Sequence, residues 1–177
     1  MTVILALDPA THTGYAIGDG TRRASGTWDL SKGVGNHPGS QLLRFAELLE
    51  WAIIDNHPNL IAYEQASFGS HNPNIQSLHN EKSGIIKLVA CQYEIRVKGL
   101  HIMQIKKFVT GNGHAKKDQM IRAARTILGL TTESDDEADA CSVLALALYE
   151  EARPPELKLT KNAKRRSAAK KTTPRLF

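Results

Sequence analysis

Four carboxylates occupy positions from which their side chains could meet at one edge of a sheet. Asp8 follows a continuous apolar run, and Glu64 follows a second, shorter apolar run. Asp136 and Asp139 open a largely apolar segment near the C-terminus, and residues three apart on a helix share one face. Strand ends gather at one edge of a mixed sheet, where ligands commonly bind. We therefore expect the four acids to form one cluster.

Such a cluster predicts a site for hard divalent cations. Carboxylate oxygens suit Mg²⁺ and Mn²⁺. Two such ions about 4 Å apart can activate a water molecule and stabilise the leaving oxygen of a phosphodiester. The chemistry predicted for Asp8, Glu64, Asp136 and Asp139 is thus phosphodiester hydrolysis with two Mg²⁺ or Mn²⁺ ions in the active site and no small-molecule cofactor.

Each acid taken singly also has a simpler explanation. An acid at a helix N-terminus is favoured by the helix dipole alone, and an acid after a strand can be an ordinary loop residue. Asp139 is the most informative of the four, because the apolar segment 140–146 follows it directly. A buried aspartate without a partner is costly, so Asp139 favours the cluster.

The elements that would position these acids follow from apolar patterning. The N-terminal part predicts strands at residues 3–7, 14–17 and 24–30, joined by short turns as an antiparallel meander. A helix is expected to begin with Ser40 as its N-cap and to end at His57. The apolar face of this helix is expected to contain Leu42, Leu43, Phe45, Leu48, Leu49 and Ile53.

The C-terminal part predicts alternating elements. A strand at residues 60–63 and a loop at 67–73 precede a helix at 74–94, on which Ile75, Leu78, Ile85, Leu88 and Val89 are apolar. A strand at 99–103 follows. Helices are then expected at 115–128, with Gly129 as C-cap, and at 135–150. The order βββ-α-β-α-β-α-α predicts an α/β fold with a mixed sheet flanked by helices.

The motifs that contain the acids resemble the RuvC family of Holliday junction resolvases, and the resemblance covers residues 3–149. It rests on the sequences LALDP with TGYA, YEQ, GNGHAKK and DEADA, in this order. The resemblance implies an RNase H-like fold with a five-stranded mixed sheet. It also implies a homodimer that cuts four-way DNA junctions by paired symmetric nicks, leaving 5′-phosphate ends.

Carried over position by position, the family's four catalytic and metal-binding acids are Asp8, Glu64, Asp136 and Asp139. Asp135 is adjacent to this set, but the family's last motif, acid-x-x-Asp-Ala, fits the register of Asp136 and Asp139. The helix at 74–94 is the dimer interface implied by the resemblance. Its apolar face could equally belong to the core of the subunit.

The glycine- and lysine-rich segment has a physical rationale for binding DNA. Gly111 and Gly113 would let the backbone approach phosphates, and the N-terminus of the following helix favours anions. The resemblance places Lys106 and Lys117 near the scissile phosphate, where Lys117 could orient the attacking water or stabilise developing charge. Lys107 and Lys116 are candidate contacts to the DNA backbone; any of these lysines could instead be merely solvated.

An aromatic residue shortly after the Glu-Gln pair is the family's contact with unstacked bases. Phe68 follows Glu64 by four residues, a spacing one residue longer than the family pattern. Stacking on bases would need no sequence preference. The alternative for Phe68 is a side chain that anchors its loop to the core.

The net charge of +5 is distributed unevenly. Residues 151–177 hold nine Lys/Arg and two Glu, whereas residues 1–150 carry a net charge of −2. We therefore expect a nuclease domain at 1–150 and a basic, disordered tail at 151–177 with little apolar content. The tail is expected to add salt-dependent, non-specific affinity for DNA, although it could also be a plain solvated segment.

The N-terminal segment, the length of the apolar stretches and the two cysteines bear on where in the cell the protein acts. The N-terminus lacks the features of a signal peptide, and no stretch approaches the roughly 18 apolar residues of a membrane span. Cys91 and Cys141 lie in apolar helical contexts and are expected to be buried free thiols. We expect the protein to act in the bacterial cytoplasm, whether it is encoded by the bacterium or by a phage. No membrane partner is expected.

Three other functions compete with a resolvase. A branch or flap nuclease could use the same acids with a relaxed preference for DNA structure. An actin-like phosphotransferase also has an aspartate at a strand end, but such proteins are longer and have two phosphate loops. A non-catalytic junction-binding module is the third, and it predicts an incomplete set of acids, whereas this set is complete.

Overall fold

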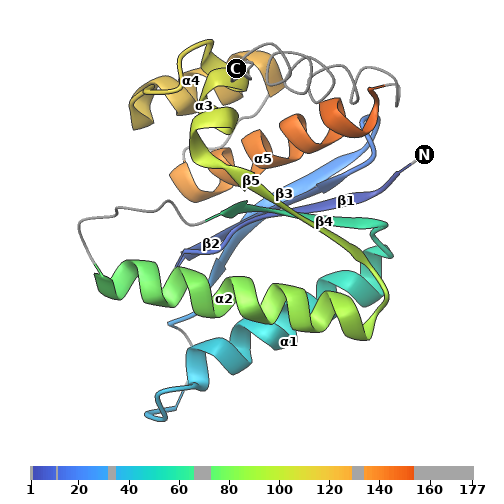
Figure 1. Ribbon diagram of the computed structural model, residues 1–177, viewed down its shortest axis with the longest axis vertical. Helices are drawn as coiled ribbons and strands as arrows, with labels where there is room; N and C mark the ends of the chain where they lie inside the picture. Colours follow the sequence, from blue (N-terminus) through green and yellow to red (C-terminus); the bar gives the residue numbers. More distant parts are fainter. Residues whose placement is uncertain (1, 11, 32–34, 66–72, 129–133, 154–177) are drawn as a thin grey trace, which may run out of the picture.

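In the computed structural model, the structure describes residues 2–10, 12–31, 35–65, 73–128 and 134–153 (Figure 1). A five-stranded sheet lies between two layers of helices. Helices α1 and α2 cover one face of the sheet, and α3, α4 and α5 lie on the other. The strands are β1 (Ile4–Asp8), β2 (His12–Gly18), β3 (Arg23–Asp29), β4 (Leu60–Gln65) and β5 (Arg96–His101). The helices are α1 (Ser40–Asn56), α2 (Pro73–Gln92), α3 (Ile102–Thr110), α4 (Lys117–Leu128) and α5 (Asp135–Glu151).

The sheet is mixed and has the order β3-β2-β1-β4-β5. Strands β1, β2 and β3 form the expected antiparallel meander, while β4 lies parallel to β1 and β5 parallel to β4. Crossovers through α1 and α2 make these parallel pairings possible. The predicted five-stranded mixed α/β sheet is thus confirmed.

Strand β1 is buried on both faces and connects two separate cores. Ile4 and Ala6 belong to the core under α3, α4 and α5. Leu5 and Leu7 belong to the core under α1 and α2. This alternation explains why β1 reads as a continuous apolar run. It also places the end of β1, and with it Asp8, between the two helical layers.

Helix α3 is an element that the sequence prediction missed. The expected strand at 99–103 is instead the end of β5, which runs from Arg96 to His101, followed without a loop by α3. The buried residues Ile105 and Val109 are four apart, which is helical spacing. The apolar residues where β5 meets α3 fit both the strand pattern and the helix pattern. The predicted strand therefore extended two residues into α3.

Several expectations about individual residues were wrong. Ser40 is the first residue of α1, whose N-cap is Gly39 without a side-chain hydrogen bond. Leu43 is 63% exposed, so it lies outside the buried face of α1. Cys91 is exposed, whereas Cys141 is a buried free thiol as expected.

Of the remaining expectations, some concern described residues and others concern residues that the structure does not describe. Helix α1 ends at His57, as predicted, and His57 has a left-handed backbone conformation. Gly129, residues 67–72 of the loop expected at 67–73, and the tail from 154 lie outside the described residues. Pro73, the last residue of that expected loop, is the first residue of α2. Among the helices of the described ranges, none has the length and apolar character needed to cross a membrane.

Candidate functional site

The parallel pairing of β1 with β4 brings the first two acids together. Leu7 pairs with Tyr63, so the residues that follow them, Asp8 and Glu64, stand side by side at the same edge of the sheet. One oxygen from each carboxylate and a ring nitrogen of His79 all lie within 4.8 Å of one another. Two acids that are 56 positions apart in the sequence thus form half of the expected cluster.

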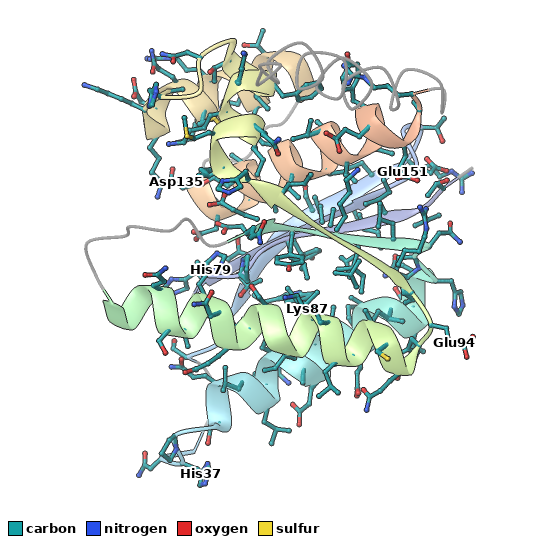
Figure 2. All side chains as sticks on the ribbon, in the orientation of Figure 1. His37, His79, Lys87, Glu94, Asp135 and Glu151 are labelled. Carbon is teal, nitrogen blue, oxygen red and sulfur yellow. The ribbon has the colours of Figure 1, made fainter. Side chains whose placement is uncertain are left out.

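The first turn of α5 provides the other two acids. Ser134 is the N-cap of α5, and its side chain accepts a hydrogen bond from the backbone N–H of Glu137. Helix α5 lies across β1 and β2, and its N-terminal end is at the strand ends, where Asp135 is labelled in Figure 2. Asp136 and Asp139 are close enough to Asp8 for their charges to act on it.

Gly14 determines how closely α5 approaches the sheet. It is paired with Asp8 across the β1–β2 ladder. A β-carbon at Gly14 would stand 1.8 Å from the carbonyl oxygen of Asp136, closer than any two such atoms can come. Only glycine leaves room for α5 at this point, so Gly14 places Asp136 beside Asp8.

The protein environment disfavours negative charge on Asp8 and Glu64. Burial raises the pKa of the Asp8 carboxyl, and the charges of Asp139 and Asp136 raise it further. Burial also raises the pKa of Glu64, followed by the charges of Asp8 and Asp139. Like charges gathered in a half-buried site repel one another, and a bound cation would remove this repulsion.

The pKa of Asp139 is also raised, although two lysines lie near this carboxyl group. Burial raises its pKa to about 6, while Lys117 and Lys106 act in the opposite direction. The nearby carboxylates Asp135 and Asp136 raise it. A surplus of carboxylates over cations at one sheet edge indicates a site that binds cations rather than a set of structural ion pairs.

Two of the predicted lysines reach the acids. Nζ of Lys117 lies 2.6 Å from Oδ2 of Asp135, and the charge of Lys117 also lowers the pKa of Asp8. Lys106, on α3, is half-buried and lowers the pKa of Glu64. Asp135 therefore forms an ion pair with Lys117 at the rim of the site. In this respect it differs from the four predicted acids.

The other predicted DNA contacts lie along the connection from α3 to α4. Lys107 and Lys116 are exposed. Gly111 has a φ of 77° and ends α3, with its N–H donating to the carbonyl of Lys107. Gly113 lies close to the backbone of Met103. This connection is a polar rim beside the acids, while Phe68 lies outside the described residues.

His79 and Lys82, both on α2, are site residues that the sequence prediction missed. Burial lowers the pKa of His79, and the charge of Lys82 lowers it further. Lys82 is fully buried, and its ammonium group donates to the carbonyl of Ala10, which also accepts from the Thr13 hydroxyl at 2.7 Å. Burial lowers the pKa of Lys82 to about 8, against the attraction of Asp8. Lys82 thus supports the β1–β2 connection just beyond Asp8.

A sequence signal for these two residues does exist. Ile86, Val89 and Ala90 are the buried apolar residues of α2. Lys82 and His79 precede Ile86 by four and seven positions, so they continue the same helical face towards the N-terminus of α2. A polar side chain in line with the buried apolar positions of a helix needs a partner. The sequence analysis considered only the apolar residues of this helix, so it did not single out Lys82 and His79.

Comparison with known proteins identifies the family of the chain. The model of the family described as crossover junction endodeoxyribonuclease RuvC matches residues 4–149. The chain belongs to the RuvC family of Holliday junction resolvases. The match begins at the first residue of β1 and ends within α5, so it contains all four predicted acids. RuvC proteins are metal-dependent nucleases, and the cluster at Asp8 and Glu64 could hold such a metal.

Individual RuvC proteins extend the comparison. Crossover junction endodeoxyribonuclease RuvC of Wolbachia sp. subsp. Brugia malayi is 32% identical over 155 residues, which are 84% of this chain and 95% of that protein. The solved structure of T. thermophilus RuvC in complex with Holliday junction substrate has a TM-score of 0.68 and 22% identity, covering 85% of this chain and 95% of that one.

A more distant structure shows the same fold. The yeast mitochondrial Holliday junction resolvase Ydc2 has a TM-score of 0.61 at 12% identity, covering 86% of this chain and 82% of that one. The RNase H-like architecture predicted from the sequence is therefore confirmed.

Proposed function

We propose that this RuvC-family protein cuts four-way DNA junctions by paired symmetric nicks. The observation that carries the proposal is the convergence of Asp8 and Glu64 with Asp136 and Asp139 at one sheet edge. These carboxylates stand close enough to repel one another, which is the arrangement of a metal-dependent nuclease. The T. thermophilus relative is described in complex with a Holliday junction, which supports the choice of substrate.

The donor set fits two divalent ions, Mg²⁺ or Mn²⁺. Asp8 stands between two groups of acids, with Glu64 on the neighbouring strand and Asp136 and Asp139 on α5. Asp8 and Glu64 would hold one ion on the side of β4, and Asp136 and Asp139 would hold the other on the side of α5. When bound, the ions supply Lewis acidity and promote ionisation of water for attack on a phosphodiester.

The protein groups around the acids would position the phosphodiester. Lys117 is held at the rim by Asp135, and its ammonium group is suited to binding a phosphate oxygen beside the acids. Lys106 would neutralise the charge of the substrate from the α3 side. Cleavage with a 5′-phosphate and a 3′-hydroxyl product would leave nicks that can be ligated.

A wider DNA-binding surface would extend from this rim. Exposed Lys107 and Lys116 are assigned to the DNA backbone, with Gly111 and Gly113 allowing close approach. Phe68 is assigned to unstacked bases at the crossover, and the basic residues of 151–177 to non-specific contacts with DNA. Phosphate contacts of this kind set affinity and make it depend on salt.

The proposed function can be tested on a labelled synthetic four-way junction with Mg²⁺. Wild type should produce nicks at symmetric positions in two opposing strands. Asp8→Asn should lower the nicking rate by on the order of 10³-fold or more, because loss of a direct metal ligand exceeds the 10- to 100-fold typical of outer partners. Junction binding in Ca²⁺ should survive, since the lysine rim is unchanged.

Three other outcomes would overturn the proposal. Cleavage of flaps and Y-forks but not of junctions would establish the branch nuclease instead. Tight junction binding without cleavage in either Mg²⁺ or Mn²⁺ would establish a binding module. Equal cleavage by wild type and Asp8→Asn would remove the acid site from the mechanism.

Symmetric cutting requires two active sites at a fixed separation, and we assign the subunit contact to the α1–α2 layer. This layer exposes large apolar side chains: Trp51 is 62% exposed, Ile54 58% and Leu88 61%. Met103, Phe108 and Tyr149 of the opposite layer are less exposed, at 36–50%, and large apolar side chains exposed to the extent of Trp51 and Leu88 indicate a protein contact surface. A second copy of the chain would cover them while leaving the acid edge open to DNA.

The double variant Trp51→Glu/Leu88→Glu should therefore be monomeric. Two charges in an apolar contact would each be desolvated without a partner, so dimer affinity should fall by at least about 100-fold. Sedimentation equilibrium measures the change, and junction nicks should lose their pairing. Tyr149→Glu is the matched control, since Tyr149 is a 45% exposed aromatic residue on α5 in the other layer. A wild-type monomer, or a dimeric double variant, would contradict the assignment.

A further inference from the structure

Helix α2 brings a histidine to the acid cluster. His79 lies on the side of α2 that faces the sheet, near the strand ends, while Asp135 lies across the sheet in the other layer (Figure 2). A ring nitrogen of His79 is within 4.8 Å of both a carboxylate oxygen of Asp8 and one of Glu64. The three side chains come from three different elements, so their proximity is a property of the tertiary fold.

The imidazole ring of His79 has a buried nitrogen to which no described residue offers a hydrogen bond. Nδ1 of His79 is buried and has no hydrogen-bond partner within the part of the chain that the structure describes. A buried nitrogen without a partner costs about 1–3 kcal/mol, so such atoms are rare without a function. Among the described residues, His79 has a buried side-chain nitrogen without a hydrogen-bond partner. This residue lies at the acid cluster.

The neighbouring residues fix the place of His79. The hydroxyl of Ser83 donates to the carbonyl of His79, 2.9 Å away, one turn further along α2. Buried Lys82 ties the same turn to the carbonyl of Ala10 at the β1–β2 connection. The turn of α2 that holds His79 is thus attached directly to the connection that follows Asp8.

We infer that His79 is a nitrogen ligand of the ion held by Asp8 and Glu64, and that it makes this site prefer Mn²⁺ to Mg²⁺. The inference rests on the proposed metal-dependent function and adds a ligand to it. Mg²⁺ binds oxygen ligands almost exclusively and loses little when a nitrogen ligand is absent. First-row transition ions accept imidazole readily, so one nitrogen among the oxygens favours Mn²⁺.

Pulsed electron paramagnetic resonance of bound Mn²⁺ tests this ligand directly. Wild-type protein loaded with Mn²⁺ should show nitrogen modulation from a coordinated imidazole, and the modulation should change when the histidines carry ¹⁵N. This measurement uses wild-type protein alone, so it does not depend on the folding of a variant. A Mn²⁺ signal without nitrogen modulation would overturn the inference.

Variants then identify the residue. His79→Gln should lose the nitrogen modulation and bind Mn²⁺ about tenfold more weakly, while Mg²⁺ affinity should change less than about threefold. His57→Asn is the matched control: His57 is an exposed histidine just before β4, at the opposite edge from Glu64, and asparagine tolerates its left-handed backbone. The control should retain both modulation and affinity. Equal losses for Mn²⁺ and Mg²⁺ in His79→Gln would mean a packing role and overturn the inference.

The same titrations separate this inference from the proposed function. Asp8→Asn should weaken Mn²⁺ binding whether or not His79 is a ligand. If Mn²⁺ binding depends on Asp8 but shows no nitrogen modulation, His79 is excluded and the metal-dependent nuclease remains. If wild type binds neither ion, or if binding does not depend on Asp8, both proposals fail.

Discussion

The variant Asp139→Asn should unfold less readily than wild type at pH 8 without metal, and should have lost junction cleavage. The pKa of Asp139 is raised from 3.8 to about 6, chiefly by burial. The folded state therefore binds this proton more tightly than the unfolded chain does. At pH 8 the wild-type carboxylate is ionised at a cost that asparagine, which is neutral, avoids.

The pH window follows from the sign of the shift. Below pH 3.8 the carboxyl is protonated in both states, and its contribution to stability is fully present. As pH rises to about 6 the unfolded chain ionises first, so this stability is lost, and the loss persists above pH 6. A shift of about two pKa units corresponds to at most about 3 kcal/mol at pH 8, less after screening by water at the open rim.

Urea denaturation in EDTA, at pH 8 and at pH 4, measures this difference. The gain in unfolding free energy of Asp139→Asn should be large at pH 8 and nearly absent at pH 4. Asp55→Asn, at an exposed acid of α1, is the control and should change little at either pH. Mn²⁺ should stabilise wild type more than Asp139→Asn, because a ligand is missing from the variant. A variant less stable than wild type at pH 8 would contradict burial and repulsion as the causes.

This conflict between stability and function explains which acids the sequence could reveal. Asp8 and Glu64 stood out in the sequence because each ends an apolar run, and the ends of such runs were expected to meet at one edge of the sheet. The parallel pairing of β1 with β4 brings them together there. Asp139 was recognisable because an ionised group among apolar residues needs a cation. In both cases the local sequence indicated that the acid needs partners from distant parts of the chain, and the sheet brings those partners together.

His79 and Lys82 could not be found in this way, because their role depends on how α2 is rotated about its axis. Leu88 is 61% exposed whereas the neighbouring Val89 is buried, so apolar content alone does not define the buried face of α2. An exposed apolar residue satisfies the periodicity of a helix as well as a buried one does. The rotation of α2 is set by tertiary contacts, such as Lys82 with the Ala10 carbonyl, that no local pattern contains.

The variant Gly14→Ala should lose cleavage and stability together. Its new methyl group would lie 1.8 Å from the carbonyl oxygen and 2.5 Å from the carbonyl carbon of Asp136. Both are backbone atoms in the first turn of α5, so no side-chain rotation relieves the clash. Helix α5 must move away from β2, which should cost about 1–3 kcal/mol or more of the unfolding free energy. A shift of about 1 Å at Asp136 and Asp139 should slow cleavage by at least about 100-fold.

Gly35→Ala separates this clash from a general effect of replacing glycine. Gly35 lies before α1, and a β-carbon there would meet only the hydroxyl oxygen of Ser40, at 3.7 Å, which is an ordinary contact. Because no clash results, this variant should change the unfolding free energy by no more than about 0.5 kcal/mol and cleave junctions at the wild-type rate. Denaturation at pH 8 with single-turnover junction cleavage measures both effects. If Gly14→Ala kept the wild-type rate and stability, α5 would have to lie further from the sheet, and Asp136 could not share a metal site with Asp8.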